Sequence, residues 1–215
     1  MIIEQFVTSG KFRLDGGEWD VDNNVYILAA GGASSDAECY IIDPSHDAER
    51  VIDEVGQRTV KGVILTHAHN DHCELAPQVA EHFGVSVYLH PDDRPLWEET
   101  HEDATFVPLE DNQLFTVGDS DFVVFHTPGH SPGCVVLYIA DEATLLSGDT
   151  LFNGGPGATG RKYSDFDVII ESLRNRVLNL PPETRVLPGH GDELSLIHIS
   201  EPTRRTERSR MPSSA

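Results

Sequence analysis

The order of hydrophobic and polar positions in the first half of the chain predicts strands that alternate with helices. Short apolar runs that end in Gly, Pro or Asp are typical of buried strands, and apolar positions three or four residues apart are typical of helices. The predicted strands are 2–8, 24–29, 38–43, 61–66 and 85–90, and the predicted helices are 48–55, 71–83 and 91–97. Between the first two strands, Ser9 to Asp20 contains Gly16-Gly17 and is predicted to be rich in turns.

The second half of the chain predicts a closer series of strands and one long helix. The predicted strands are 105–107, 113–117, 122–126, 133–140, 143–146 and 185–187. Residues 163–179 are predicted to be helical, with one apolar stripe formed by Phe166, Ile169, Ile170, Leu173 and Val177. Because each run of strands comes with helices, the pattern indicates two sheets packed between helices in one domain.

Composition narrows the classes of function. The chain has 215 residues, 39% hydrophobic and 24% charged, which suits one globular domain. Its formal net charge of -21 argues against nucleic acid and anionic membranes as partners, because both bind basic surfaces. No apolar stretch is long enough to span a bilayer, and Met1 to Gln5 shows no secretory signal. The cysteines Cys39, Cys73 and Cys134 cannot form a disulfide framework, so a cytoplasmic location is expected. The sequence leaves the oligomeric state open.

A histidine-rich stretch follows the apolar run Gly62 to Leu65 and reads Thr-His-Ala-His-Asn-Asp-His from Thr66 to His72. In an extended segment, residues two apart point to the same side, so His67 and His69 can bind one ion together. Asp71 and His72 are adjacent, diverge, and can face a second ion. Imidazole and carboxylate are the ligands that suit zinc and its neighbours, so the stretch predicts a metal site.

This stretch resembles the HxHxDH motif of the metallo-β-lactamase fold, and three further motifs follow in the family's order. They contain His130 in Thr-Pro-Gly-His-Ser-Pro-Gly, Asp149 in Ser-Gly-Asp-Thr and His190 in Leu-Pro-Gly-His-Gly. The resemblance covers about residues 1–193 and implies an α+β fold, the αββα sandwich of two mixed β-sheets between helices. It also implies two divalent metal ions, zinc first, with iron or manganese as alternatives.

The resemblance assigns a role to each ligand. His67, His69 and His130 would bind one ion, Asp71, His72 and His190 would bind the other, and Asp149 would bridge them. A hydroxide held between the ions would be the nucleophile, and Asp71 would act in catalysis by orienting it or carrying a proton. Asp43 resembles the family aspartate that supports a metal ligand. Taken singly, each outer ligand could be an ordinary turn residue, and the histidines at 46, 82, 90, 101 and 126 are read as structural.

The bridging Asp149 argues against the β-lactamases of this fold, which place Cys or Ser there, and favours the glyoxalase II branch of hydroxyacylglutathione hydrolases. Those enzymes cleave thioesters such as S-lactoylglutathione, so a small-molecule thioester or ester is the expected substrate. Arg161 and Tyr163 match positions that contact the thiol carrier, although they could also be a surface cation and a core aromatic. The chain is too short for the helical domain that completes the glutathione site, so the carrier stays open.

Two alternatives remain. A persulfide dioxygenase of the same fold uses one iron, but its Arg-Thr-Asp stretch is absent here, since Lys162 and Tyr163 follow Arg161. The other is a non-catalytic metal-binding domain. The loss of a ligand would have supported it, but none of the motif ligands is lost.

The end of the chain is read separately. Leu194 to Arg204 and Ser209 to Ala215 resemble the translation of a transposon-type sequencing adapter. We therefore expect 194–215 to be an artefactual, disordered tail in place of the natural C-terminus, and His198 is not counted as a ligand.

Overall fold

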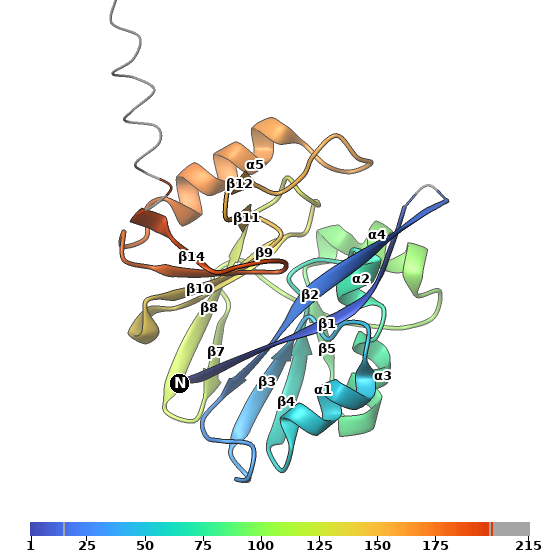
Figure 1. Cartoon of the computed structure of the whole chain (residues 1–215), viewed down its shortest axis with the longest axis vertical. Helices are drawn as coiled ribbons and strands as arrows, with labels where there is room; N and C mark the ends of the chain where they lie inside the picture. The colour runs from blue at the N-terminus through green and yellow to red at the C-terminus, as the bar shows by residue number, and fades with distance from the viewer. Residues whose placement is uncertain (15, 198, 200–215) are drawn as a thin grey trace, which may run out of the picture.

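The computed structural model describes residues 1–14, 16–197 and 199, and contains two six-stranded mixed sheets (Figure 1). The first sheet has the order β1 (Ile2–Leu14), β2 (Gly17–Ala29), β3 (Glu38–Ile42), β4 (Thr59–Ile64), β5 (Val87–Leu89), β6 (Val107–Pro108). The second has the order β14 (Leu194–Ser195), β13 (Arg185–Pro188), β10 (Thr144–Gly148), β9 (Val135–Ile139), β8 (Ser120–His126), β7 (Leu114–Val117). The helices are α1 (Ala48–Val55), α2 (Asn70–Cys73), α3 (Ala76–Phe83), α4 (Arg94–Thr100) and α5 (Phe166–Ser172).

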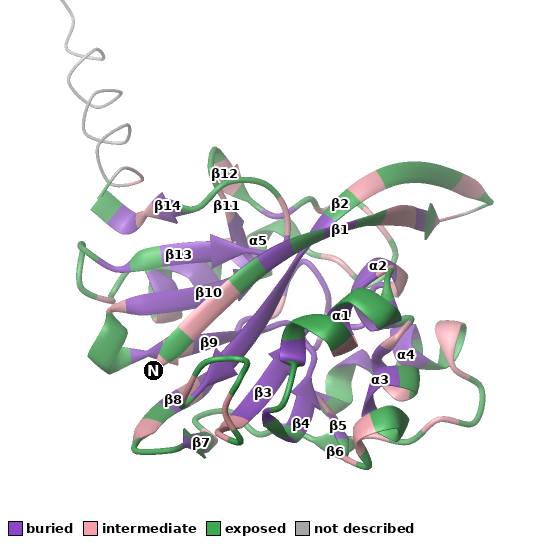
Figure 2. Cartoon of the chain, turned by 60° about the horizontal axis from the view of Figure 1, so that its bottom comes forward, coloured by how far each residue is buried: buried purple, intermediate pink, exposed green. Residues whose placement is uncertain are grey.

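Alternation along the inner strands builds the layers. In β2, Val25 and Ile27 face the core beneath α1, α3 and α4, whereas Tyr26 and Leu28 face the core between the sheets. A third core packs α5 and the turn after it, including Leu173, against the far side of the second sheet. Figure 2 shows the buried strands inside and the exposed outer surfaces of the helices. The predicted αββα sandwich is confirmed.

The prediction of turns between Ser9 and Asp20 is wrong. β1 and β2 pair along their whole length, from Ile2 opposite Ala29 to Leu14 opposite Gly17, and project beyond the sheet (Figure 1). Cross-strand contacts hold this extension, since Phe12 packs on Trp19 and Lys11 pairs with Asp20 at 2.7 Å. Gly16 and Gly17 mark the hairpin turn and its flank, and Lys-Phe-Arg-Leu at 11–14 already shows the alternation of a strand.

Three predicted helices are wrong in their boundaries. The helix predicted for 91–97 is a 3-10 turn over Pro91–Asp93 followed by α4, which ends at Thr100. The helix predicted for 71–83 is two helices, α2 and α3, and Pro77 stands in the first turn of α3, where a missing N–H costs nothing. The helix predicted for 163–179 begins only at Phe166, because the Asp165 carboxylate caps it by accepting from two backbone N–H groups. It continues through Leu173–Val177 as a wider turn. Phe166, predicted to be in the core stripe, is 56% exposed.

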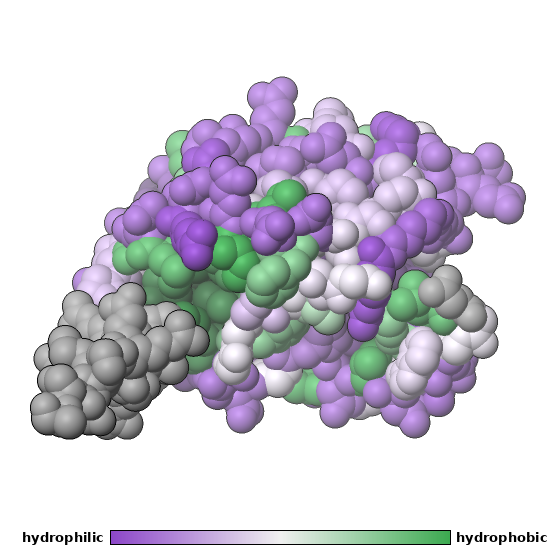
Figure 3. All heavy atoms as spheres, turned by 90° about the horizontal axis from the view of Figure 1, so that it is seen from above, coloured by the Kyte–Doolittle hydropathy of each residue, from purple (hydrophilic) through white to green (hydrophobic). Residues whose placement is uncertain are grey.

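Smaller elements also differ from the prediction. The strand predicted for 105–107 is reduced to β6, and the short hairpin of β11 (Leu151–Phe152) with β12 (Gly155–Pro156) was not predicted. β14 begins within the adapter-like segment and pairs with β13, while 200–215 and His198 lie outside the described residues. Figure 3, viewed from the α5 end, shows mostly polar surface, with the largest group of apolar side chains left of centre. No helix in the described part of the chain is long and apolar enough to cross a membrane.

Candidate metal centre

The histidine-rich stretch lies just beyond the carboxyl end of β4, a parallel strand of the first sheet. His67 and His69 lie in the extended segment before α2, and Asp71 and His72 lie in the single turn of that helix. This change of backbone conformation separates the first pair from the second. All four side chains are buried, with at most 7% of any residue exposed.

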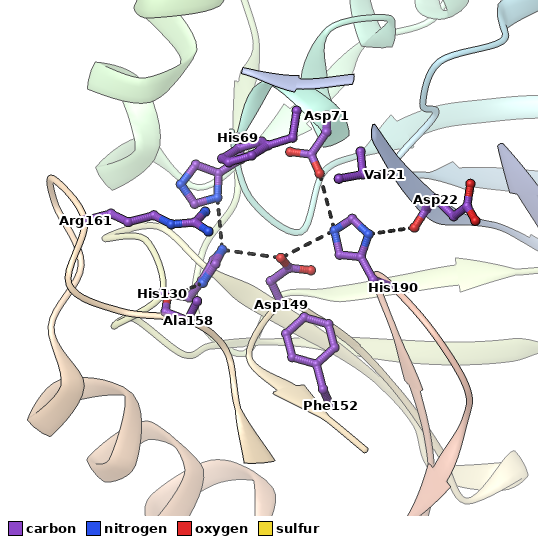
Figure 4. A pocket seen from close by; sticks show the side chains of 11 residues that line it. Val21, Asp22, His69, Asp71, His130, Asp149, Phe152, Ala158, Arg161 and His190 are labelled. Carbon is purple, nitrogen blue, oxygen red and sulfur yellow. Dashed lines mark hydrogen bonds and ion pairs between the residues drawn. The ribbon is translucent and has the colours of Figure 1, made fainter. Parts of the chain in front are cut away.

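The other three ligands come from loops of the second sheet. His130 lies between β8 and β9, Asp149 directly follows β10, and His190 follows β13. These loops meet α2 at one end of the sandwich, and Figure 4 shows His69, Asp71, His130, Asp149 and His190 directed toward one another. Three groups of ligand atoms lie within 4.8 Å of one another: His67, His69 and His130; His67, His72 and Asp149; and Asp71, His72 and His190. The structure therefore brings all seven predicted ligands together.

We call His67, His69 and His130 the first half of the centre, and Asp71, His72 and His190 the second half. In the first half, His69 Nδ1 lies 2.9 Å from His130 Nε2. In the second half, His190 Nε2 lies 3.1 Å from His72 Nε2 and 3.3 Å from Asp71 Oδ2.

Asp149 lies between the halves. Its Oδ2 is 3.4 Å from His130 Nε2 and 3.6 Å from His190 Nε2, and its Oδ1 is 3.5 Å from His72 Nε2. One carboxylate thus faces ligand atoms of both halves, which is the arrangement expected of a bridging ligand.

Hydrogen bonds on the outer side of the rings fix which nitrogen faces inward. His130 Nδ1 donates to the Ala158 carbonyl at 2.8 Å, and His190 Nδ1 donates to the Asp22 carbonyl at 2.7 Å. Since a carbonyl can only accept, Nδ1 carries the proton in both rings and Nε2 is left to bind. This is the arrangement that metal-binding histidines show.

Asp43 organises one histidine of each half. It accepts from the Thr66 N–H at 2.7 Å, from Thr66 Oγ1 at 2.6 Å and from His72 Nδ1 at 3.1 Å. Because the Thr66 hydroxyl donates to Asp43, its oxygen accepts from His67 Nδ1, 3.2 Å away. The contacts of Asp43 are those expected of a residue that supports metal ligands.

The two halves differ in charge. Burial, together with neighbouring imidazoles, lowers the pKa of His67 and lowers the pKa of His69 to about 3, so the first half presents neutral rings. Burial opposes protonation of His72 as well, but Asp71, Asp149 and Asp43 outweigh it and raise its pKa to about 10. A divalent cation would satisfy the same negative field that draws a proton onto His72.

The donor set fits metal ions. His67 Nε2 and Asp149 Oδ1 are buried and, among the described residues, have no hydrogen-bond partner. Such orphaned atoms are costly unless a ligand satisfies them. Imidazole nitrogens with carboxylate oxygens suit zinc, iron and manganese, so the donor set gives no choice among these metals.

Sequence reasoning missed Asn23. Its fully buried amide donates to the Asp71 carbonyl at 3.1 Å and to Asp71 Oδ2 at 3.2 Å. Its own oxygen accepts from His46 Nε2 at 2.7 Å, so the amide orientation is set by a histidine that was read as structural. His46 has a positive φ of 58°, a strained backbone for a histidine. Because Asn23 lies between Asp22 and Asn24 in the polar half of β2, the sequence carried no signal that would have singled it out.

A cavity of about 400 Å³ opens onto the centre and is lined by His69, Asp71, His130, Asp149, Arg161 and His190, among others. A second cavity of about 520 Å³ shares His69 and Arg161 with it and runs along the β1–β2 hairpin. Arg161 stacks on Phe12 at 4.9 Å, and among the described residues its guanidinium has no carboxylate partner. Figure 4 shows that it points toward His69 and His130. Tyr163 is 41% exposed, contacts Lys162, and is not among the residues lining these two cavities.

A further cluster joins His90, Asp92 and His126 away from this centre. The two rings stack in parallel at 3.8 Å, so the lone pairs in their planes do not converge on one point. His126 Nε2 donates to the Pro132 carbonyl at 2.9 Å. These contacts fit the structural role read from the sequence.

Comparison with known proteins identifies the relatives of this chain. The family profile of the Metallo-beta-lactamase superfamily matches residues 19–190. Hydroxyacylglutathione hydrolase GloC of Haemophilus influenzae is 31% identical over 167 residues, which cover 70% of this chain and 79% of that protein. The crystal structure of TTHA1623 in a di-iron-bound form superposes with a TM-score of 0.72 at 32% identity, covering 84% of this chain and 93% of that one. The crystal structure of the B3 metallo-beta-lactamase BLEG-1 superposes with a TM-score of 0.70 at 32% identity, covering 88% of this chain and 94% of that one.

Proposed function

The chain belongs to the metallo-beta-lactamase superfamily, and from this premise we propose that it is a two-metal hydrolase that cleaves a thioester or ester of a small anionic molecule. The position of Asp149 carries the proposal, because its carboxylate faces ligand atoms of both halves of the centre. The two ions are proposed to be zinc, with iron or manganese as alternatives. The di-iron form of TTHA1623 is consistent with a binuclear centre of this kind.

Each half would hold one ion. His67, His69 and His130 would bind the first, Asp71, His72 and His190 would bind the second, and Asp149 would contact both. When bound, such a pair of ions lowers the pKa of water, so that hydroxide is available at neutral pH.

Asp71 is the residue of this chain proposed to manage the proton. Burial tends to raise its pKa, but the neighbouring His72 and His190 outweigh burial and hold the pKa below its usual value. The carboxylate is therefore ionised and able to accept. Asn23 holds its Oδ2 in place, so Asp71 can orient the attacking water and take up its proton as the new C–O bond forms. Asp71 can then return this proton to the sulfur or oxygen of the leaving group as the C–S or C–O bond breaks.

Arg161 supports an anionic substrate. Its guanidinium reaches into the metal cavity and, among the described residues, makes no ion pair. An unpaired, partly buried cation favours a carboxylate or similar anion beside it. The relative GloC is by its name a hydroxyacylglutathione hydrolase, so S-lactoylglutathione is the first substrate to test.

The test combines elemental analysis of bound metal with hydrolysis of S-lactoylglutathione by the same preparation. We expect about two ions per chain and turnover. Asp149→Asn should lose metal and turnover, whereas Asp192→Asn, an exposed aspartate near His190, serves as the matched control and should lose neither.

Other outcomes select other functions. One iron per chain without hydrolysis would refute the binuclear thioesterase and favour persulfide oxidation. Two ions with cleavage of a chromogenic cephalosporin and no thioesterase activity would favour the lactamase reading that BLEG-1 suggests. Two ions without any hydrolysis would point to a non-catalytic metal-binding domain.

A further inference from the structure

Asp93 is a completely buried carboxylate between β5 and α4, outside the set of metal ligands. Its Oδ2 accepts from the Ala68 N–H at 2.9 Å and from the Ser131 hydroxyl at 2.8 Å, and its Oδ1 accepts from the Gly133 N–H at 2.5 Å. Although Asp93 stands at the start of α4, its side chain makes no cap hydrogen bond to that helix. The three hydrogen bonds that its carboxylate accepts come from two loops.

Those two loops carry the first half of the metal centre. Ala68 lies between His67 and His69, and Ser131 directly follows His130. The loops belong to different sheets and are about sixty residues apart, yet one carboxylate bonds to both. The Asp93 side chain therefore links the two ligand loops through hydrogen bonds.

The fit around Asp93 is close. A Cβ built on Gly133 would lie 2.6 Å from the Asp93 nitrogen and 2.8 Å from its Cβ and Cγ, so only glycine permits this approach. Burial raises the pKa of Asp93, and the Ser131, Gly133 and Ala68 donors act in the opposite direction by favouring the carboxylate. Buried groups with several satisfied bonds are rigid, and loops bonded to them share that rigidity.

We propose that Asp93 is a positioning residue that holds His67, His69 and His130 at binding distance and sets the metal affinity of the first half of the centre. The inference rests on the two-metal centre of the proposed function. It separates the roles of two buried aspartates: Asp43 reaches a histidine of each half, whereas Asp93 bonds to the residue between His67 and His69 and to the residue after His130, which flank ligands of the first half.

The experiment measures zinc affinity one half at a time, by competition between the zinc-loaded full chain and a chelating dye. The His190→Ala variant has a weakened second half, so its measured zinc affinity is that of the first half. The His130→Ala variant has a weakened first half, so its measured zinc affinity is that of the second half. Asp93→Asn keeps the shape but turns one acceptor into an NH₂ group that faces N–H and O–H donors. Asp92→Asn is the matched control, since Asp92 is the preceding residue and its side chain is 57% exposed.

In the His190→Ala background, Asp93→Asn should lower zinc affinity about 10–100-fold, the range seen when outer partners of metal ligands are removed. In the His130→Ala background it should leave affinity unchanged, and Asp92→Asn should change neither. Asp43→Asn should lower affinity in both backgrounds.

Equal losses from Asp93→Asn in both backgrounds, or no loss in either, would overturn the proposal. If Asp93→Asn fails to fold, Ser131→Ala removes one donor and should weaken the first half alone. A wild-type chain that binds no zinc, iron or manganese would refute the proposed function itself. A wild-type chain with two ions and an Asp93→Asn variant of unchanged affinity would refute only the role of Asp93.

Discussion

A methyl group at position 189 tests the centre at its most crowded point. A Cβ on Gly189 would lie 2.5 Å from Asp149 Oδ1 and 2.7 Å from His72 Cε1. Ordinary contact begins at 3.4 Å, so the oxygen or the loop must move by about 0.9 Å, the difference between these distances. The loop is held, because the Gly189 N–H donates to Gly148 O at 2.9 Å and its carbonyl accepts from Asn24 at 2.8 Å. Metal–ligand distances tolerate only about 0.2 Å, so Asp149 could not keep its bridging position.

Gly189→Ala should therefore lose at least one of the two ions on dialysis, measured by elemental analysis, and thioester hydrolysis should fall with it. Gly191→Ala is the control in the same loop, since a methyl group there meets nothing within 4 Å. Its φ of 73° makes alanine cost about 1–2 kcal/mol of stability, visible as a lower Tm, with metal retained. A Gly189→Ala variant that kept two ions at wild-type affinity would refute the reasoning.

Three further predictions follow from the same geometry. His130→Ala and His190→Ala each remove a ligand from a different half, so each variant should hold one ion per chain in elemental analysis, and two ions in either would contradict the assignment. Arg161→Ala should raise KM for S-lactoylglutathione about tenfold or more with metal content unchanged, because charge-assisted hydrogen bonds are worth about 1.5–3 kcal/mol, and Arg161→Lys should recover part of the loss. Burial, and after it the neighbouring His126, lowers the pKa of His90 from 6.5 to about 4. As the pH falls, the unfolded chain therefore takes up this proton at a higher pH than the folded chain does. The stability that neutral His90 provides is present above pH 6.5 and lost as pH falls toward 4, and His90→Gln should flatten the fall of Tm across that window.

The layers of the fold and the histidine-rich stretch could be predicted for one physical reason: both are local patterns. The other three predicted ligands, His130, Asp149 and His190, came from the resemblance of their motifs to a known family. Alternation in β2 and β3 set which side chains face each core, and the ligand motifs each follow a predicted strand. The element boundaries were less accessible. Glycines at 16 and 17 were read as a general turn region, while pairing of Phe12 with Trp19 and of Lys11 with Asp20 extends the strands almost to the tip.

The positioning residues Asn23 and Asp93, unlike Asp43, were hidden from the sequence for a different reason. A metal restricts its ligands to a few side-chain types, and His67, His69 and His72 are close enough in sequence for that restriction to be visible. Asp93 instead accepts from two backbone N–H groups and one hydroxyl, which nearly every segment of chain can offer. What distinguishes it is the approach of two loops from different sheets, and that approach exists only after both sheets have packed. Aspartates such as Asp93 should therefore be sought by the donors that converge on them, since the sequence around Asp93, at the start of a helix, indicates only a cap.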